Sequence, residues 1–145
     1  MTAPDLSTTT PRSPRTLLAG HVIAARTLDK CRAVIAGTNG EYHYDCPLDN
    51  LFFEYTGINA DTFKAQVATG ADDAAMATWI TETATPHTPT ELAVWNNSLR
   101  YKRICEMPAE LQLFLETYIP EVIPEEKRPH VRYWFDVYDL EEGRM

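Results

Sequence analysis

The sequence is poor in cysteine, in positive charge and in long apolar runs, and each shortage argues against a class of protein. Its 145 residues include only three cysteines, Cys31, Cys46 and Cys105, which are widely spaced and form no CxxC pair. No secretory segment precedes them, so we expect reduced thiols and a cytoplasmic location. No apolar run approaches the roughly 20 residues of a membrane-spanning helix. The sequence therefore predicts a soluble protein without a membrane anchor.

Basic residues are also few, because 13 Lys and Arg stand against 21 Asp and Glu, for a net charge of -8. Such a charge repels phosphate backbones and removes the electrostatic attraction on which nonspecific nucleic-acid binding depends. We therefore expect no nucleic-acid partner. No pattern in the chain indicates a cofactor, and the sequence leaves the oligomeric state open.

The length and the 44% hydrophobic content are those of one ordinary domain with a continuous core. Residues 1–15 are mostly Thr, Ser and Pro and offer little apolar surface to bury, so they are predicted to be a disordered N-terminal arm. Residues 16–145 are predicted to form a single helical domain.

Apolar residues recur at steps of three and four along most of this domain, which is typical of amphipathic helices. Pro47 and the Thr88-Pro89-Thr90-Glu91 segment are start signals, and Asn59 can cap a helix. In the helix after Pro108, Leu111, Phe114, Leu115 and Tyr118 are predicted to form the buried face. The predicted helices cover residues 16–36, 47–57, 59–70, 71–84, 88–105 and 108–120, with a loop over residues 120–129.

The segment after His130 fits two patterns. Val131, Tyr133, Phe135 and Val137 alternate as in a strand, but a helical face passes through Trp134 and Tyr138 as well. A strand would need a partner, and no other segment offers one, so we favour a short helix. The sequence thus predicts an all-α, single-domain orthogonal bundle of six to seven short helices.

Residues 37–49, with the sequence GTNGEYHYDCPLD, hold the densest group of reactive side chains in the chain. No diagnostic catalytic motif is present. Together with residues 26–33 (RTLDKCRA) and the terminal Trp134-Phe135-Asp136, Asp139 and Glu142-Gly143-Arg144, this segment resembles the bacterial domain-of-unknown-function family numbered 5069 over residues 12–145. The resemblance implies a small, soluble, single-domain protein and carries no activity, cofactor or catalytic assignment.

Our leading hypothesis is a non-enzymatic binding or interaction domain. The 37–49 loop, backed by basic residues of the preceding helix, would bind a small anionic ligand or a protein partner, because guanidinium and ammonium groups pair with carboxylates and phosphates. A solvated, weakly paired helix face is the alternative reading of those basic residues. The candidate ligand-binding residues are Arg26, Lys30, Arg32, Tyr42, His43, Tyr44 and Asp45.

Two further hypotheses stay open. The first is a thiol-dependent enzyme that uses Cys46 at the helix start as nucleophile and His43 as base. The second is a purely structural network of buried polar groups that only holds the loop in place. His43, Asp45 and Cys46 are also metal-ligand types, but the other histidines lie on different elements and show no paired spacing, so no metal site is predicted.

Overall fold

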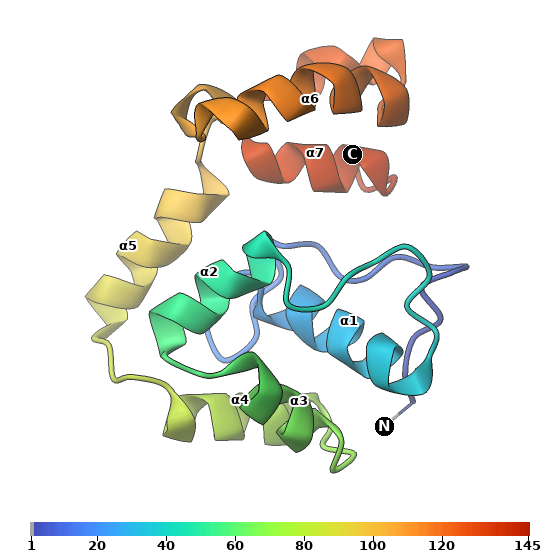
Figure 1. The fold of residues 1–145 in the computed structure, drawn as a ribbon. Coiled ribbons are helices and arrows are strands. Elements are labelled where there is room, and N and C mark those ends of the chain that lie inside the picture. Colours follow the sequence, from blue (N-terminus) through green and yellow to red (C-terminus); the bar gives the residue numbers. More distant parts are fainter. Residues whose placement is uncertain (1) are drawn as a thin grey trace. The chain divides into compact units, whose positions relative to one another are not determined.

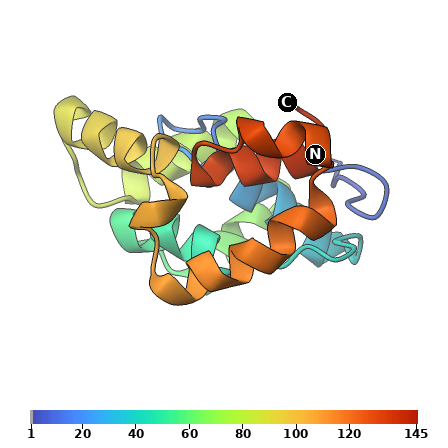
Figure 2. The same ribbon diagram turned by 90° about the horizontal axis from the view of Figure 1, so that it is seen from above.

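A computed structural model describes residues 2–145 of the chain, which form α-helices, two short 3-10 helices and no strand (Figures 1 and 2). The predicted all-α class is therefore confirmed, and the seven α-helices agree with the predicted six to seven. The α-helices are α1 (Ala24–Ala36), α2 (Pro47–Thr56), α3 (Ala60–Val67), α4 (Asp73–Thr83), α5 (Pro89–Arg100), α6 (Ala109–Val122) and α7 (Trp134–Glu141), and the 3-10 helices are η1 (Ile104–Glu106) and η2 (Glu125–His130).

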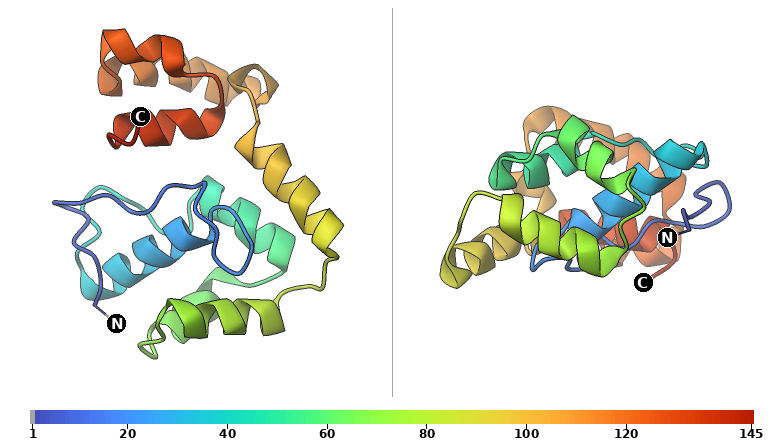
Figure 3. Two further views of the ribbon diagram at one scale, coloured as in Figure 1. Left: turned by 180° about the vertical axis from the view of Figure 1, so that it is seen from behind. Right: turned by 90° about the horizontal axis from the view of Figure 1, so that it is seen from below.

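The chain divides into two compact units, and the boundary between them along the sequence falls within α5. The first ends at Leu92 and the second is Ala93–Met145. The single-domain organisation of residues 16–145 stays a prediction. Figure 3 shows the ribbon of both units from further sides.

The first unit is built around α1, which contacts α2 and α3. Leu28 of α1, Phe52 of α2 and Phe63 of α3 are completely buried. The rings of Phe52 and Phe63 meet edge to face, with 6.0 Å between their centroids. Apolar side chains at helical spacing thus form this core, as the periodicity of the sequence indicated.

The first helix begins at Ala24 and not at Thr16, so the predicted start is wrong by two turns. Residues 18–21 form a tight turn in which the amides of Leu18 and His21 donate to each other's carbonyl groups. Gly20 and Ile23 have positive φ angles of 75° and 74°, which a right-handed helix cannot contain. Spacing of apolar residues does not reveal such backbone angles, which explains the error.

The other helix starts follow the predicted signals. Pro47 is the first residue of α2, and the Asn59 side chain accepts a hydrogen bond of 2.7 Å from the amide of Asp61 at the start of α3. At α5 the amide of Thr88 donates to Glu91 Oε1 at 2.8 Å, and the amide of Glu91 donates to Thr88 Oγ1 at 3.1 Å. These caps depend on neighbours in sequence, so the sequence alone predicts them.

In the second unit, the predicted terminal helix is confirmed as α7. Leu115, Ile123, Val137 and Leu140 form the buried core of this unit. Several predicted bounds are corrected: α5 ends at Arg100 rather than Cys105, α6 continues past Pro120 to Val122, and residues 125–130 form η2 instead of a loop. The sequence predicts where these helices start better than where they end, because packing of the apolar face decides how far each helix runs.

The segment predicted as a disordered arm is packed against the first unit over residues 2–15, whereas Met1 lies outside the described residues. Leu6 is buried, and its amide donates to the Thr38 carbonyl at 2.8 Å. Arg12 lies 3.0 Å from Asp29 and 2.8 Å from Asp73. One apolar side chain and one guanidinium of this segment thus have partners that are remote in sequence, and the disordered arm over residues 1–15 stays a prediction.

Candidate functional site

A buried ion pair joins α1 to the start of α2. Lys30 Nζ lies 2.9 Å from Asp49 Oδ1, and the two side chains are 4% and 0% exposed. Lys30 is on the face of α1 that packs toward α2, and Asp49 is the third residue of α2 after the proline start. The pair therefore holds the end of the 37–49 segment against α1.

The carboxylate of Asp49 is satisfied on both oxygens. Thr27 Oγ1 donates to Oδ1 at 2.6 Å, beside Lys30. The amides of Asp45 and Cys46 donate to Oδ2 at 3.0 and 3.4 Å. These donors replace the water that a buried carboxylate loses.

Cys46 shares the same lysine. Lys30 Nζ donates to Cys46 Sγ at 3.2 Å, and Cys46 is half-buried. His43, its predicted base, is exposed and forms no hydrogen bond in the described part of the chain. The structure therefore brings Cys46 to Lys30 and Asp49 but does not bring His43 to Cys46.

The remaining predicted basic residues, Arg26 and Arg32, are buried and face internal partners. Arg26 donates from Nη1 to the Arg12 carbonyl at 3.2 Å. Arg32 Nη1 lies 2.8 Å from Asp73 Oδ1, and its Nη2 donates to the Ala71 carbonyl at 3.0 Å. These contacts show that both guanidinium groups hold α1 to the segments around it.

Two tyrosines of the 37–49 segment lie against α1 and α3. The Arg26 guanidinium stands over the Tyr42 ring at 5.6 Å from its centroid. Tyr44 donates from its hydroxyl to the Ala60 carbonyl at 2.6 Å, and burial raises its pKa above the ordinary range. Burial also raises the pKa of the neighbouring Cys31 thiol to about 11. The side chains of Tyr44 and Cys31 are thus uncharged at physiological pH and serve as packing groups.

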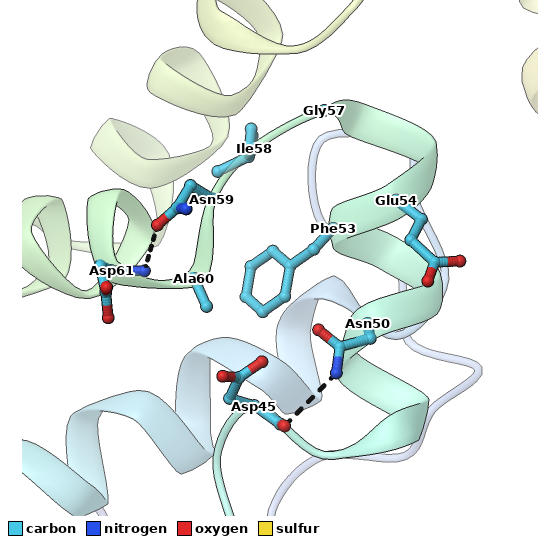
Figure 4. Close-up of a pocket in the computed structure, with 9 residues that line it drawn as sticks. All are labelled: Asp45, Asn50, Phe53, Glu54, Gly57, Ile58, Asn59, Ala60 and Asp61. Atoms are coloured by element: carbon cyan, nitrogen blue, oxygen red, sulfur yellow. Dashed lines mark hydrogen bonds between the residues drawn. The ribbon is translucent and has the colours of Figure 1, made fainter.

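A separate pocket of about 470 Å³ lies beside this network, between α2 and the start of α3. Figure 4 shows Phe53 in its centre, with the Asp45 carboxylate on one side and the Asn59–Ala60 segment on the other. Asp45 has a φ of 65°, a left-handed conformation that Asp tolerates better than most residues. The pocket is lined by Asp45, Asn50, Phe53, Glu54, Gly57, Ile58, Asn59, Ala60 and Asp61.

The charge of this pocket is negative. Asp45, Glu54 and Asp61 line it, with Asp45 turned toward Phe53 and the other two at its margins (Figure 4). Within residues 2–145, none of these three carboxylates forms a hydrogen bond or an ion pair. The predicted residue Asp45 is therefore at a candidate site whose ligand would be cationic.

Sequence reasoning missed most of this pocket. Phe53 and Glu54 lie inside α2, and Asp61 lies in α3, so only the turn at Gly57 brings them together. Asp49 and Thr27 were also absent from the predicted site. A signal for Asp49 existed, since the third position of a helix is where a carboxylate can accept from the amide of the cap residue.

No group of three or more His, Cys, Asp or Glu side chains suited to hold a metal ion occurs among residues 2–145. In the same part of the chain, none of the helices has both the length and the apolar character to cross a bilayer.

The helices and the pocket define an all-α protein with a candidate ligand site on its first unit. Residues 8–144, nearly the whole chain, match the family described as "Domain of unknown function (DUF5069)", and the chain belongs to this family. The resemblance seen in the sequence is thereby confirmed. No curated protein matches the sequence.

Proposed function

We propose that the protein is a non-enzymatic binding domain that takes a lysine or arginine side chain of a protein partner into the pocket beside Asp45. The observation that carries the proposal is the unpaired state of the Asp45, Glu54 and Asp61 carboxylates around an open pocket, within the described chain. Carboxylates at such a surface attract a cation and can accept its hydrogen bonds.

The size and lining of the pocket favour a side chain over a bare ion. About 470 Å³ is within the range of ligand pockets, and the floor contains Phe53 and Ile58, which are both apolar. The alkyl stem of a lysine or arginine can lie along such a floor while its charged end meets Asp45. An aromatic ring near the cation adds a favourable electrostatic contact.

The whole-chain charge also supports a cationic partner. A net charge of -8 raises the encounter rate with basic proteins at low ionic strength. By contrast, a small anion at Arg26, Lys30 and Arg32 would have to displace internal partners from buried side chains. The contacts of these three residues therefore favour a cationic ligand over the anionic one that the sequence suggested.

The test is a titration of labelled protein, followed by NMR, with N-acetyl-lysine amide and N-acetyl-arginine amide. We expect shift changes at residues 45–61 that an uncharged N-acetyl-norleucine amide does not produce. Asp45→Asn should weaken binding about threefold to fivefold, the range for a solvent-exposed ion pair. Asparagine tolerates the left-handed backbone of position 45, so the fold should be kept.

Glu82→Gln is the matched control, because Glu82 is an exposed carboxylate of the first unit outside the pocket. It should leave the titration unchanged. Equal binding of the charged and uncharged probes, or equal loss in the Asp45 and Glu82 variants, contradicts the proposal.

A second candidate is a reactive thiol at Cys46. It is supported by the Lys30 ammonium group, 3.2 Å from the sulfur, since a neighbouring cation stabilises a thiolate. The Lys30 ammonium group, and not His43, would then favour the thiolate, because no hydrogen bond joins His43 to Cys46 among residues 2–145. A Cys46 that iodoacetamide modifies faster than the exposed Cys105 at neutral pH would support this candidate, and a slower reaction of Cys46 would remove it.

A further inference from the structure

Helix α6 carries two large apolar side chains that the core of its own unit does not take up. Leu113 is 73% exposed and Phe114 is 55% exposed, although Phe114 was predicted to be buried. A neighbouring face of α6 already supplies that core, with Leu115 inside it and Leu111, Tyr118, Ile119 and Val122 packed against it. Leu113 and Phe114 therefore lie outside the buried core of this unit.

A hollow of about 360 Å³ runs along the exposed face. All of its lining residues belong to α6 and recur at steps of three and four, so they form one stripe along the helix. We call this surface the α6 stripe, and it consists of Glu110, Leu113, Phe114, Thr117, Tyr118 and Glu121.

The aromatic part of the α6 stripe is held in place. The Phe114 and Tyr118 rings stack with 5.0 Å between centroids and 26° between planes. The Tyr118 hydroxyl donates to Glu141 Oε1 of α7 at 2.7 Å. A surface that is ordered before binding loses little conformational entropy when a partner arrives, which favours recognition.

The two ends of the α6 stripe are acidic. Glu110 and Glu121 are about 16 Å apart along the axis, given the helical rise of about 1.5 Å per residue. Neither carboxylate forms a hydrogen bond or ion pair in the part of the chain that the structure describes. An occupant of the stripe therefore needs apolar groups in the middle and positive charge at both ends.

We propose that the α6 stripe docks an amphipathic helix of a protein partner, with apolar side chains on Leu113 and Phe114 and Lys or Arg near Glu110 and Glu121. A second copy of this chain fits less well. Antiparallel pairing of two stripes sets Glu110 of one copy against Glu121 of the other, and parallel pairing sets each glutamate against its equivalent. Like charges face each other in both cases.

The probe is a designed, fluorescein-labelled helical peptide of about 18 residues, five helical turns, with a leucine stripe and lysines at its two ends. Anisotropy measures its binding to the full chain. Phe114→Ala should weaken binding about tenfold or more, as expected for a central aromatic anchor. Val94→Ala is the control, because Val94 is 65% exposed in the same unit but outside the stripe.

A charge exchange tests the ends of the stripe. A peptide with glutamates in place of the lysines should bind the wild type at least about tenfold more weakly. The double variant Glu110→Lys/Glu121→Lys should reverse that preference. In an Asp45→Asn background, which removes the pocket carboxylate of the proposed function, the preference for the lysine peptide and the loss caused by Phe114→Ala should both persist, so failure here is distinguishable from failure of the proposed function.

Three results overturn the inference. The first is equal binding of the two peptides by the wild type, and the second is unchanged peptide binding in Phe114→Ala. The third is self-association of the wild type, measured by sedimentation velocity, that Phe114→Ala abolishes and Val94→Ala does not, since the occupant would then be a second copy. Glu110, Phe114 and Glu121 are solvent-exposed, so the variants at these positions should fold, and circular dichroism checks this.

Discussion

The ammonium group of Lys30 and the carboxylate of Asp49 form an ion pair of 2.9 Å that is almost completely removed from solvent. Lys30 lies on α1, before the 37–49 segment, and Asp49 is the last residue of that segment, on α2. A buried pair of this kind contributes to stability only while both members are present, because the loss of one leaves the other charge without water or a partner.

Removal of the lysine should therefore be costly. We expect Lys30→Met to lower the free energy of unfolding by about 3 kcal/mol or more, the usual effect of breaking a buried ion pair. Urea unfolding followed by circular dichroism measures the change. Lys64→Met, at a partly exposed lysine of the same unit, should change the free energy by less than about 0.5 kcal/mol.

The double variant Lys30→Met/Asp49→Asn separates lost charge pairing from lost packing. Asparagine keeps an oxygen for Thr27 but carries no charge, so the double variant should regain part of the stability that Lys30→Met loses. If the double variant is no more stable than Lys30→Met, the cost does not come from the orphaned carboxylate but from lost packing or from the amides of Asp45 and Cys46, which lose an acceptor in the asparagine variant.

The N-terminal segment should depend on Arg12, which pairs with Asp29 and Asp73. We expect Arg12→Ala to lower the free energy of unfolding by about 1 kcal/mol, since the guanidinium is partly exposed and screened by solvent. Limited proteolysis should then cleave within residues 2–15 faster than in the wild type. Arg15→Ala serves as the comparison, and equal cleavage of the two variants would show that Arg12 does not hold the segment.

Stability should fall in mild acid because of His21. Burial lowers the pKa of His21 below its usual range; the hydrogen bond of 2.7 Å to the Ala19 carbonyl opposes this shift and the nearby His87 adds to it. In the unfolded chain the pKa returns to about 6.5. Below that pH His21 is protonated in the unfolded state but not in the folded state. The free energy of unfolding therefore declines until the pH reaches the lowered pKa of His21 in the folded state.

Urea midpoints between pH 7.5 and pH 5 measure this dependence. His21→Asn should reduce the slope, because asparagine does not titrate, and its amide can still donate to the Ala19 carbonyl. The exposed His43→Asn variant should keep the wild-type slope. A wild-type slope in His21→Asn would assign the acid sensitivity to other groups.

The three cysteines should differ in their alkylation rates. Iodoacetamide should modify the exposed Cys105 first and the half-buried Cys46 next, whereas Cys31 should react only on unfolding, because burial removes it from solvent and raises its pKa to about 11. Peptide mass spectrometry measures each rate. Because no hydrogen bond joins His43 to Cys46 among residues 2–145, His43→Ala should not change the Cys46 rate, and a several-fold loss of that rate would support His43 as the base.

The two compact units should unfold together. Residues 93–145 form a unit smaller than the roughly 70 residues below which a single core rarely supplies much stability, so this unit should not be stable by itself. Differential scanning calorimetry should show one transition whose calorimetric and van't Hoff enthalpies agree. Two resolved transitions would contradict the predicted single domain.

The sequence by itself determined the all-α class and the helix starts at Pro47, Asn59 and Thr88. These features depend on residues within one or two turns of each other, where capping, proline geometry and apolar spacing act directly. The terminal helix was predictable for a related reason, since a strand at residues 131–137 would have needed a partner strand, and no other segment of the sequence offered one.

Only the tertiary structure decided which charges meet. The sequence indicated Arg26, Lys30 and Arg32 as ligand-binding groups, but the fold places all three against internal partners. It leaves Asp45 beside an acidic pocket that the turn at Gly57 creates. An ion pair forms or fails according to distance and burial, and both depend on how helices pack and not on their spacing in the chain.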